Sequence, residues 1–269
     1  MFARALRILV CLMLGAASGA LAQTPSGVLL ADFTWPELGQ RIRSGATTIL
    51  VPVGGTEQNG PHMVLGKHNR RVLVLSERIA VALGNALVAP VIAYVPEGRV
   101  EPATSHMRFP GTITIPEAAF EQVLEYAARS FKLHGFRDIV LLGDHGGYRK
   151  SLQALASRMN REWAATPVRV HAIDEYYAVT QTRYAQALRN RGVSDAEIGT
   201  HAGLADTSLA LAIDPTLVRT DLLRSGAAIG ATEGAYGDPR RSSAQLGQLG
   251  IDAIVPATVA AIRTAVARR

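Results

Sequence analysis

Cysteine is almost absent from this chain of 269 residues. The single one, Cys11, lies in an N-terminal segment that has a basic start, an apolar centre from Ile8 and small residues at Ala20 and Ala22. These features predict a secretory signal peptide over residues 1–22, with cleavage after Ala22. The remaining chain then has no cysteine, which excludes disulfides and thiolate metal ligands. Any metal site has to use histidine, carboxylate or amide groups.

Long apolar runs and dense clusters of one charge are also lacking after the signal. We see no later run that is apolar enough to span a bilayer, so we expect export, most simply to a bacterial periplasm, and no membrane attachment after cleavage. The net charge is +6, but the densest basic pairs, Arg70-Arg71 and Arg240-Arg241, are isolated. Nucleic-acid binding needs a continuous basic stripe, so we expect no nucleic-acid partner.

What the sequence does have is a regular alternation of apolar runs and helical periodicity. The predicted strands cover residues 48–53, 86–93, 138–142 and 168–173. The predicted helices cover residues 71–83, 116–135 and 150–163. Strands separated by helices predict an α/β fold whose mostly parallel sheet is covered on both faces. Because 48% of the residues are hydrophobic and no linker interrupts the pattern, we expect residues 23–269 to form one domain.

Three polar clusters stand where such a sheet binds ligands, beyond the carboxyl ends of its strands. Residues 57–68 follow the first strand, GDHGG at 143–147 follows the third, and THAGLADTS at 200–208 opens a further predicted helix. Histidines with carboxylates are typical ligands of divalent metals, and glycine-rich loops let the backbone approach a ligand closely. The three clusters together predict a hydrolytic metal site.

The first cluster carries a family resemblance. The segment VPVGGTEQNGPHMVLGKHN, at residues 51–69, resembles the creatininase signature, in which a strand ends in Gly-x-x-Glu-Gln-His-Gly-Pro-His-Leu-Pro-Leu-Gly-Thr-Asp. Further matches cover nearly all of the remaining chain, in the order APVIAY, SHMRFPGTITI, GFRDIVLLGDHGG, HAGLADTS and GAYGDP. The resemblance implies a three-layer α/β/α fold, a homo-oligomer, and two divalent metals at the carboxyl edge of the sheet.

Several positions depart from the family pattern. Asn59 stands where a metal-binding histidine is expected, His68 where the bridging aspartate belongs, and Asp144 replaces a glycine. A bridging carboxylate offers two oxygens to two cations, whereas a neutral imidazole offers one nitrogen to one cation. The departures therefore predict a single divalent ion, zinc first and manganese or iron as alternatives, held by Glu57, His68 and His145.

Three protein ligands and one open position are usual for catalytic zinc, which lowers the pKa of a bound water towards neutrality. We therefore expect a hydrolase that cleaves a carbon–nitrogen bond of a small, cyclic or N-substituted amide through a metal-activated water. His201 is the candidate for protonating the leaving nitrogen. Asp206 is expected either to bind the metal or to orient His201.

Other polar residues near the clusters are expected in lesser roles. His106 and Tyr148 are candidates for contact with the substrate, and His62 and Asn59 for hydrogen bonds that support the loop around the site. An alternative stays open, in which the chain has lost its metal ligands and binds a small ligand or has a structural role. Leu204, apolar where many members carry glutamate, favours that alternative, whereas the gain of His68 alongside the histidine lost at position 59 favours a retuned enzyme.

Overall fold

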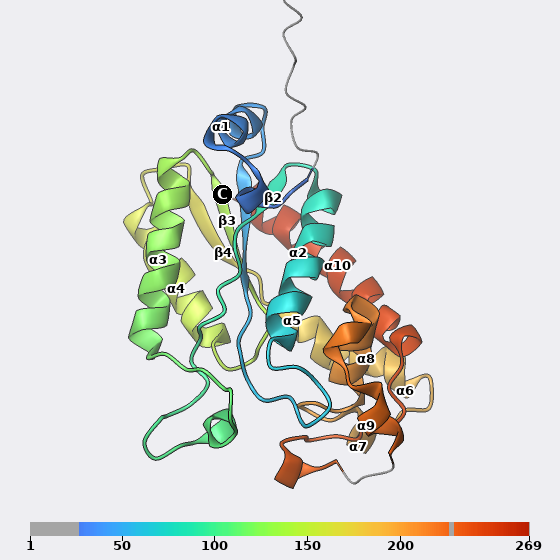
Figure 1. The fold of residues 1–269 in the computed structure, drawn as a ribbon. Coiled ribbons are helices and arrows are strands. Elements are labelled where there is room, and N and C mark those ends of the chain that lie inside the picture. The colour runs from blue at the N-terminus through green and yellow to red at the C-terminus, as the bar shows by residue number, and fades with distance from the viewer. Residues whose placement is uncertain (1–26, 226–228, 269) are drawn as a thin grey trace, which may run out of the picture.

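A four-stranded parallel sheet in the order β2-β1-β3-β4 forms the centre of the molecule (Figure 1). The computed structural model describes residues 27–225 and 229–268, so the predicted signal peptide lies outside the described residues. The strands are β1 (Thr48–Val53), β2 (Ala86–Val88), β3 (Asp138–Gly143) and β4 (Arg169–Ala172). All pairs are parallel, and β1 is in register with β3 over its full length. The predicted parallel sheet is confirmed.

The second strand is shorter than the predicted 86–93 because Pro90 interrupts it. Proline has no N–H to give to a ladder of strand hydrogen bonds. The chain nevertheless continues beside β1, since the backbone N of Ile92 donates to Pro52 O at 2.9 Å and that of Gly54 to Ile92 O at 3.0 Å. This extension brings the segment after β2 to the carboxyl end of β1.

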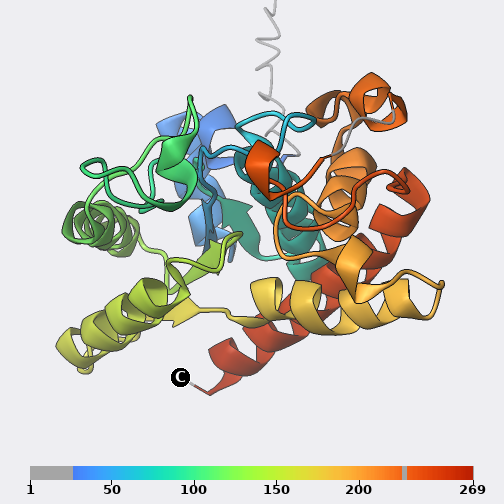
Figure 2. The ribbon, with the colours of Figure 1, turned by 90° about the horizontal axis from the view of Figure 1, so that it is seen from below.

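Two hydrophobic cores, one on each face of the sheet, confirm the three-layer α/β/α arrangement. Along β1 the side chains alternate between them, with Ile49 and Val51 in one core and Leu50 in the other. The first core lies under α1 (Trp35–Arg43), α3 (Glu117–Leu133) and α4 (Arg149–Glu162). The second lies under α2 (Lys67–Leu83), α5 (Glu175–Val179) and α10 (Ala244–Ala267). Figures 1 and 2 show α3 and α4 on the opposite side of the strands from α2 and α10, and Figure 1 shows α1 above one end of the sheet.

The predicted helices are present, with shifted ends. Helix α2 buries Val72, Leu75 and Ile79 on one face and ends at Gly84, which adopts the left-handed conformation that favours glycine. It begins at Lys67, four residues before the prediction, and this places His68 in its first turn. The shorter helices are α6 (Ala185–Arg189), α7 (Asp195–Ile198), α8 (Leu204–Ile213), α9 (Thr220–Arg224), the π-helix η3 (Thr180–Tyr184) and the 3-10 turns η1 (Leu30–Asp32), η2 (Ser105–Arg108), η4 (Pro215–Leu217) and η5 (Ala231–Glu233).

Helix α10 corrects the expectation that no later segment has the length and composition of a membrane span. Its 24 residues are apolar enough for one by that criterion, although 33% of its most apolar window is buried inside the protein. Ile251, Ile254 and Ile262 pack in the second core beside α2, α5 and α8, which is the environment of a core helix. Pro256 lies within this helix.

Candidate metal centre

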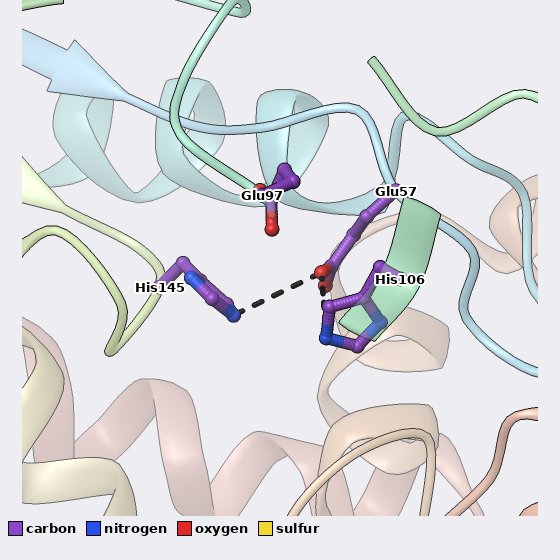
Figure 3. A group of neighbouring side chains, drawn as sticks. All are labelled: Glu57, Glu97, His106 and His145. Carbon is purple, nitrogen blue, oxygen red and sulfur yellow. Dashed lines mark ion pairs between the residues drawn. The ribbon is translucent and has the colours of Figure 1, made fainter. Parts of the chain in front are cut away.

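Four acidic and histidine side chains converge at the carboxyl edge of the sheet (Figure 3). Glu57 follows β1, His145 follows β3, Glu97 lies on the segment after β2, and His106 lies in η2. Each offers one ligand atom, and these atoms all lie within 4.8 Å of one another. Both glutamates are buried and both histidines are partly buried. This group is the candidate metal centre.

Glu97 reaches the centre because a glycine leaves room for it. Gly55 has φ of 152°, a conformation that L side chains rarely adopt, and a Cβ built on it would lie 2.7 Å from Glu97 Oε1. The backbone N of Glu97 donates to Thr114 Oγ1 at 3.0 Å, which fixes its segment against the neighbouring chain. The loops after β1 and β2 are therefore fitted to each other around the Glu97 carboxylate.

Three buried carboxylate oxygens at the centre lack a hydrogen-bond partner among the described residues: Oε2 of Glu57 and both oxygens of Glu97. Oε2 of Glu57 lies 3.3 Å from His106 Nε2 and 3.8 Å from His145 Nε2. Leaving such groups buried and unsatisfied is costly, and a bound cation would take up one oxygen of each glutamate. Zinc ligands in a tetrahedral site lie roughly 3.5 Å apart, so small movements of these side chains would enclose a cation.

The two glutamates have opposite pKa shifts. Burial, together with the nearby charge of Glu57, raises the pKa of Glu97 to about 9. Burial alone would also raise the pKa of Glu57, but the hydrogen bond and charge of His68, with the charges of His145 and Lys67, hold it well below its usual value. At neutral pH the metal-free centre therefore holds one ionised and one protonated carboxyl group.

The two histidines of the centre are neutral and present Nε2 to it. Burial lowers the pKa of His145 to about 4 and also lowers that of His106. Behind the rings, Gly147 N donates to His145 Nδ1 at 3.1 Å, and the Gln58 amide lies 2.9 Å from His106 Nδ1. For Nε2 of His145 to bind a cation, its proton has to move to Nδ1, which ends the hydrogen bond from Gly147. Two imidazoles and two carboxylates are a donor set that suits zinc, manganese or iron.

The contacts of His68 argue against its predicted role as a metal ligand. Its Nε2 lies 2.7 Å from Glu57 Oε1 and its Nδ1 lies 2.6 Å from Asp144 Oδ2. Burial would raise the pKa of Asp144, but the charge of Arg71 and the hydrogen bond from His68 lower it, so both partners are ionised and only accept. Arg71 Nη2 lies 3.1 Å from the same Nδ1, but the shorter contact to the carboxylate sets the direction. Both ring nitrogens of His68 are thus in contact with carboxylates, and neither faces the four residues of the centre as a free ligand.

Asp206 also has other partners than predicted. Its Oδ1 accepts from Arg71 Nη1 at 2.7 Å, and its Oδ2 accepts from Lys67 Nζ at 2.9 Å and from Ala202 N at 3.1 Å. Burial would raise the pKa of Asp206, but the charges of Lys67 and Arg71 hold it well below its usual value. These contacts argue against a metal-binding role and against orientation of His201. Asp206 instead neutralises two buried cations.

His201 faces the centre from the segment before α8. With its proton on Nε2, His201 donates to the backbone oxygen of Gln58 at 3.0 Å, while the side-chain nitrogen of Gln58 lies 3.1 Å from the same Nε2. Its Nδ1 lies 3.7 Å from Glu57 Oε1. Burial, with the charge of Lys67, lowers its pKa to about 4. The ring is therefore neutral at neutral pH, and Nδ1 is free to accept a proton. Its predicted role in protonating a leaving nitrogen then requires that it first takes up a proton.

The placement of Tyr148 argues against the predicted contact with substrate. The side chain is only 1% exposed and packs in the first core beside Phe120. Its hydroxyl lies 2.8 Å from Val53 O and 2.6 Å from Gly54 O, and it accepts from Asp144 N at 3.1 Å. Tyr148 therefore ties the ends of β1 and β3 together beneath the centre.

His62 and Asn59 have the kind of contacts expected of supporting residues. Nε2 of His62 lies 2.9 Å from Thr207 Oγ1, which joins the loop after β1 to α8. Nδ2 of Asn59 donates to the backbone oxygens of Glu57 at 2.8 Å and of Val64 at 3.2 Å. Asn59 thus stabilises the turn that carries Glu57.

Backbone strain occurs beside two of the site histidines. Ser105 has φ of 49° and precedes His106, and Ala202 has φ of 53° and follows His201. Such conformations are unfavourable for residues other than glycine and cluster at functional sites. A cavity of about 150 Å³ opens beside these histidines, and the π-helix η3 forms part of its wall with Thr180, Gln181 and Tyr184.

Glu97 is a residue of the candidate metal centre that the sequence patterns did not single out. It follows the second predicted strand, at the same sheet edge as the other clusters, but the polar clusters stand out only after the first and third strands. His106 was expected to contact substrate rather than metal. The sequence shows that Glu97 follows the end of a strand, which could have indicated a role at this edge. It does not show that Glu97 is buried.

Comparisons with known proteins agree with the fold. A family model described as creatinine amidohydrolase matches residues 31–262. Creatinine amidohydrolase of Pseudomonas putida is 29% identical over 199 residues, which are 72% of this chain and 75% of that protein. Mycofactocin precursor peptide peptidase of Mycolicibacterium smegmatis is 31% identical over 230 residues, which are 78% and 81% of the two chains.

Solved creatininase structures superimpose on nearly the whole fold. A crystal structure of creatinine amidohydrolase has a TM-score of 0.73 at 24% identity and covers 88% of this chain and 97% of its own. A structure described as manganese creatininase has a TM-score of 0.70 at 27% identity, with 88% and 98% covered, and a mutant described as Zn-Zn type has 0.71 at 26%, with 89% and 98% covered. Because the family model matches residues 31–262 of the 269, the chain belongs to the creatininase family.

Proposed function

We propose that this chain is a hydrolase of a carbon–nitrogen bond in a small polar amide, and that it uses one divalent metal ion held by Glu57, Glu97, His106 and His145. The observation that carries the proposal is the convergence of three unpartnered, buried carboxylate oxygens with two neutral imidazoles. Family membership supports the hydrolytic class. Zinc is the first candidate for the ion, and relatives described as Zn-Zn and Mn forms keep manganese open.

The balance of charged side chains around the centre supports the binding of a cation beside Glu97. Among the described residues, the buried carboxylates of Glu57 and Asp144 and the half-buried carboxylate of Asp206 have close contacts with His68, Arg71 and Lys67. Glu97 has no such partner there, and for that reason its carboxyl group holds a proton without metal. A divalent ion would release that proton and take up one oxygen of each glutamate.

The side chains around the centre have separate roles in such a reaction. A metal bound by these four side chains would supply Lewis acidity, and it would lower the pKa of a water only in a fifth position beside them. His201 accepts a proton at Nδ1 from the attacking water and returns it to the leaving nitrogen. The Gln58 backbone oxygen holds Nε2–H of His201, so the free nitrogen stays directed towards Glu57. The strained backbone at Ser105 and Ala202 supports a fixed placement of both neighbouring histidines.

The cavity favours a small, polar substrate. Its volume of about 150 Å³ is bounded by charged Arg71 and Asp206 and by polar Gln181. A second hollow of about 360 Å³ is also lined by His106 and His201, together with Gln58, Phe109 and Tyr236. Space in both hollows suits an N-substituted amide, and the relatives named as an amidohydrolase and a peptidase are consistent with such a bond.

The test combines metal analysis with a substrate screen. Protein reconstituted with zinc, manganese or iron is assayed against cyclic amides, N-substituted amides and short peptides, with Glu57→Gln and His201→Gln variants beside it. We expect turnover that requires metal, is lost in Glu57→Gln together with metal, and is lost in His201→Gln while the metal is retained. A protein that binds metal but turns over no amide would favour the alternative of a non-catalytic binding protein. A protein that binds no metal would refute the proposal.

We also propose that the protein is exported to the periplasm and forms a homo-oligomer. Export rests on the signal-like composition of residues 1–22. Association is supported by large apolar side chains on the outer helices, where Trp35, Tyr126 and Leu133 are 86%, 69% and 80% exposed. Cell fractionation and light scattering after size-exclusion chromatography test the two statements separately.

A further inference from the structure

Two departures from the family pattern meet in one contact. His68, where the signature has a bridging aspartate, lies 2.6 Å through Nδ1 from Asp144, which stands in place of a glycine. Both side chains are about 4% exposed. Asp144 is itself held by Arg71 Nε at 2.8 Å and by the hydroxyl of Tyr176 at 2.8 Å. The histidine and the aspartate are therefore an anchored pair rather than two independent substitutions.

The other nitrogen of His68 contacts only one of the two carboxylate oxygens of Glu57. Nε2 of His68 lies 2.7 Å from Oε1 of Glu57, so that oxygen is occupied. Oε2 has no hydrogen-bond partner among the described residues and turns towards His106 and His145. A carboxylate held in this way offers one oxygen to one cation.

We propose that His68 is a positioning residue, which holds Glu57 as a one-oxygen ligand and commits the centre to a single metal ion, with Asp144 as its anchor. The inference rests on the proposed metal centre and adds how this chain converts a two-metal framework into a one-metal site. Charge-assisted hydrogen bonds to both carboxylates give the imidazole a fixed orientation. Lys67 and Arg71 keep the surrounding charges balanced through Asp206 and Asp144.

The experiment uses His68→Gln and His68→Leu in the full chain, with His134→Gln as a matched control on an exposed histidine. Metal-free protein is titrated with zinc against a competing chelator, and the zinc X-ray absorption spectrum gives the number of imidazole ligands. We expect one zinc per wild-type chain. His68→Leu should weaken zinc binding about 10- to 100-fold, as is usual when an outer partner of a ligand is removed. His68→Gln, whose amide still donates towards Glu57, should recover part of that loss.

The imidazole count separates positioning from ligation. The number of imidazole ligands should be the same in wild type and in His68→Gln. If His68→Leu fails to fold, His68→Gln alone still provides this test. Loss of one imidazole in His68→Gln would show that His68 binds the metal and overturn the inference, while the hydrolase proposal stands. Unchanged zinc affinity in both variants, compared with His134→Gln, would overturn it as well. Absence of zinc binding by wild-type protein would remove the metal centre and this inference together.

Discussion

Replacing Glu97 by glutamine should stabilise the metal-free protein and weaken its binding of metal. The pKa of Glu97 is raised to about 9 in the folded protein, mainly by burial, whereas in the unfolded chain it is near 4.5. Between these values the folded protein holds a proton that the unfolded chain has released. The free energy of unfolding therefore falls by about 1.4 kcal/mol per pH unit as pH rises from 4.5 to 9.

At pH 7 this cost amounts to about 3 kcal/mol relative to pH 4.5. Glutamine has nearly the shape of the protonated acid and does not titrate, so metal-free Glu97→Gln should be more stable than wild type by about that amount at pH 7. The difference should shrink towards pH 4.5. In the presence of metal the order reverses, because the variant lacks one of two carboxylate ligands.

The assay is urea unfolding of chelator-treated protein at pH 5, 7 and 8.5, followed by zinc titration at pH 7. Glu101→Gln, which changes an exposed carboxylate on the same segment, is the control. Equal stability of Glu97→Gln and wild type at all three pH values would refute the presence of an unpartnered, buried carboxyl group. Unchanged zinc affinity would remove Glu97 from the metal centre.

Four further changes test other parts of the structure. Gly55→Ala should destabilise the protein by about 1–3 kcal/mol and weaken zinc binding, because its Cβ would meet Glu97 Oε1; thermal unfolding and zinc titration measure both. His201→Gln should lower kcat by about 10²- to 10⁴-fold and leave zinc affinity nearly unchanged, as steady-state kinetics and titration would show. Tyr148→Phe should lower stability in urea by about 1–3 kcal/mol while KM stays the same, since its hydroxyl serves the backbone. The pKa of His62 is lowered to about 4 by burial, so between pH 6.5 and 4 the unfolded chain binds a proton that the folded protein does not. As pH falls through that range, the free energy of unfolding should therefore fall by about 3 kcal/mol less in His62→Gln than in wild type.

Each of these has a contradicting result. A silent Gly55→Ala would mean that the loops after β1 and β2 move freely. Loss of metal in His201→Gln would make His201 a ligand, and a large rise of KM in Tyr148→Phe would return that residue to the substrate site. If His62→Gln and wild type lose the same free energy of unfolding between pH 6.5 and 4, His62 is not held neutral in the folded protein.

The sheet could be predicted from the sequence because its strands are short, continuous apolar runs. Thr48–Val53 and Asp138–Gly143 are buried along their whole length, as is typical of central strands in a parallel sheet. The predicted end of the second strand was wrong, because Pro90 interrupts the hydrogen bonds between strands within an otherwise apolar run. Helix α10 has its apolar residues spread around much of its surface, so it gave no clear periodic face.

The candidate site was predictable in position but not in its ligand set. Strand ends fixed where Glu57 and His145 would lie, because parallel strands share one carboxyl edge. Which nitrogen of His68 faces which carboxylate depends on Asp144, which lies 76 positions away in sequence. Likewise, Glu97 enters the centre only because Gly55 leaves space beneath it. Such pairings arise from tertiary packing and have no local signal.

The most direct test of the one-metal centre is an anomalous difference map from crystals of the zinc-loaded protein. We predict one strong peak per chain, bonded to Glu57, Glu97, His106 and His145, with His68 still held between Glu57 and Asp144. Two peaks, or a single peak bonded to His68, would contradict a one-metal centre of this composition.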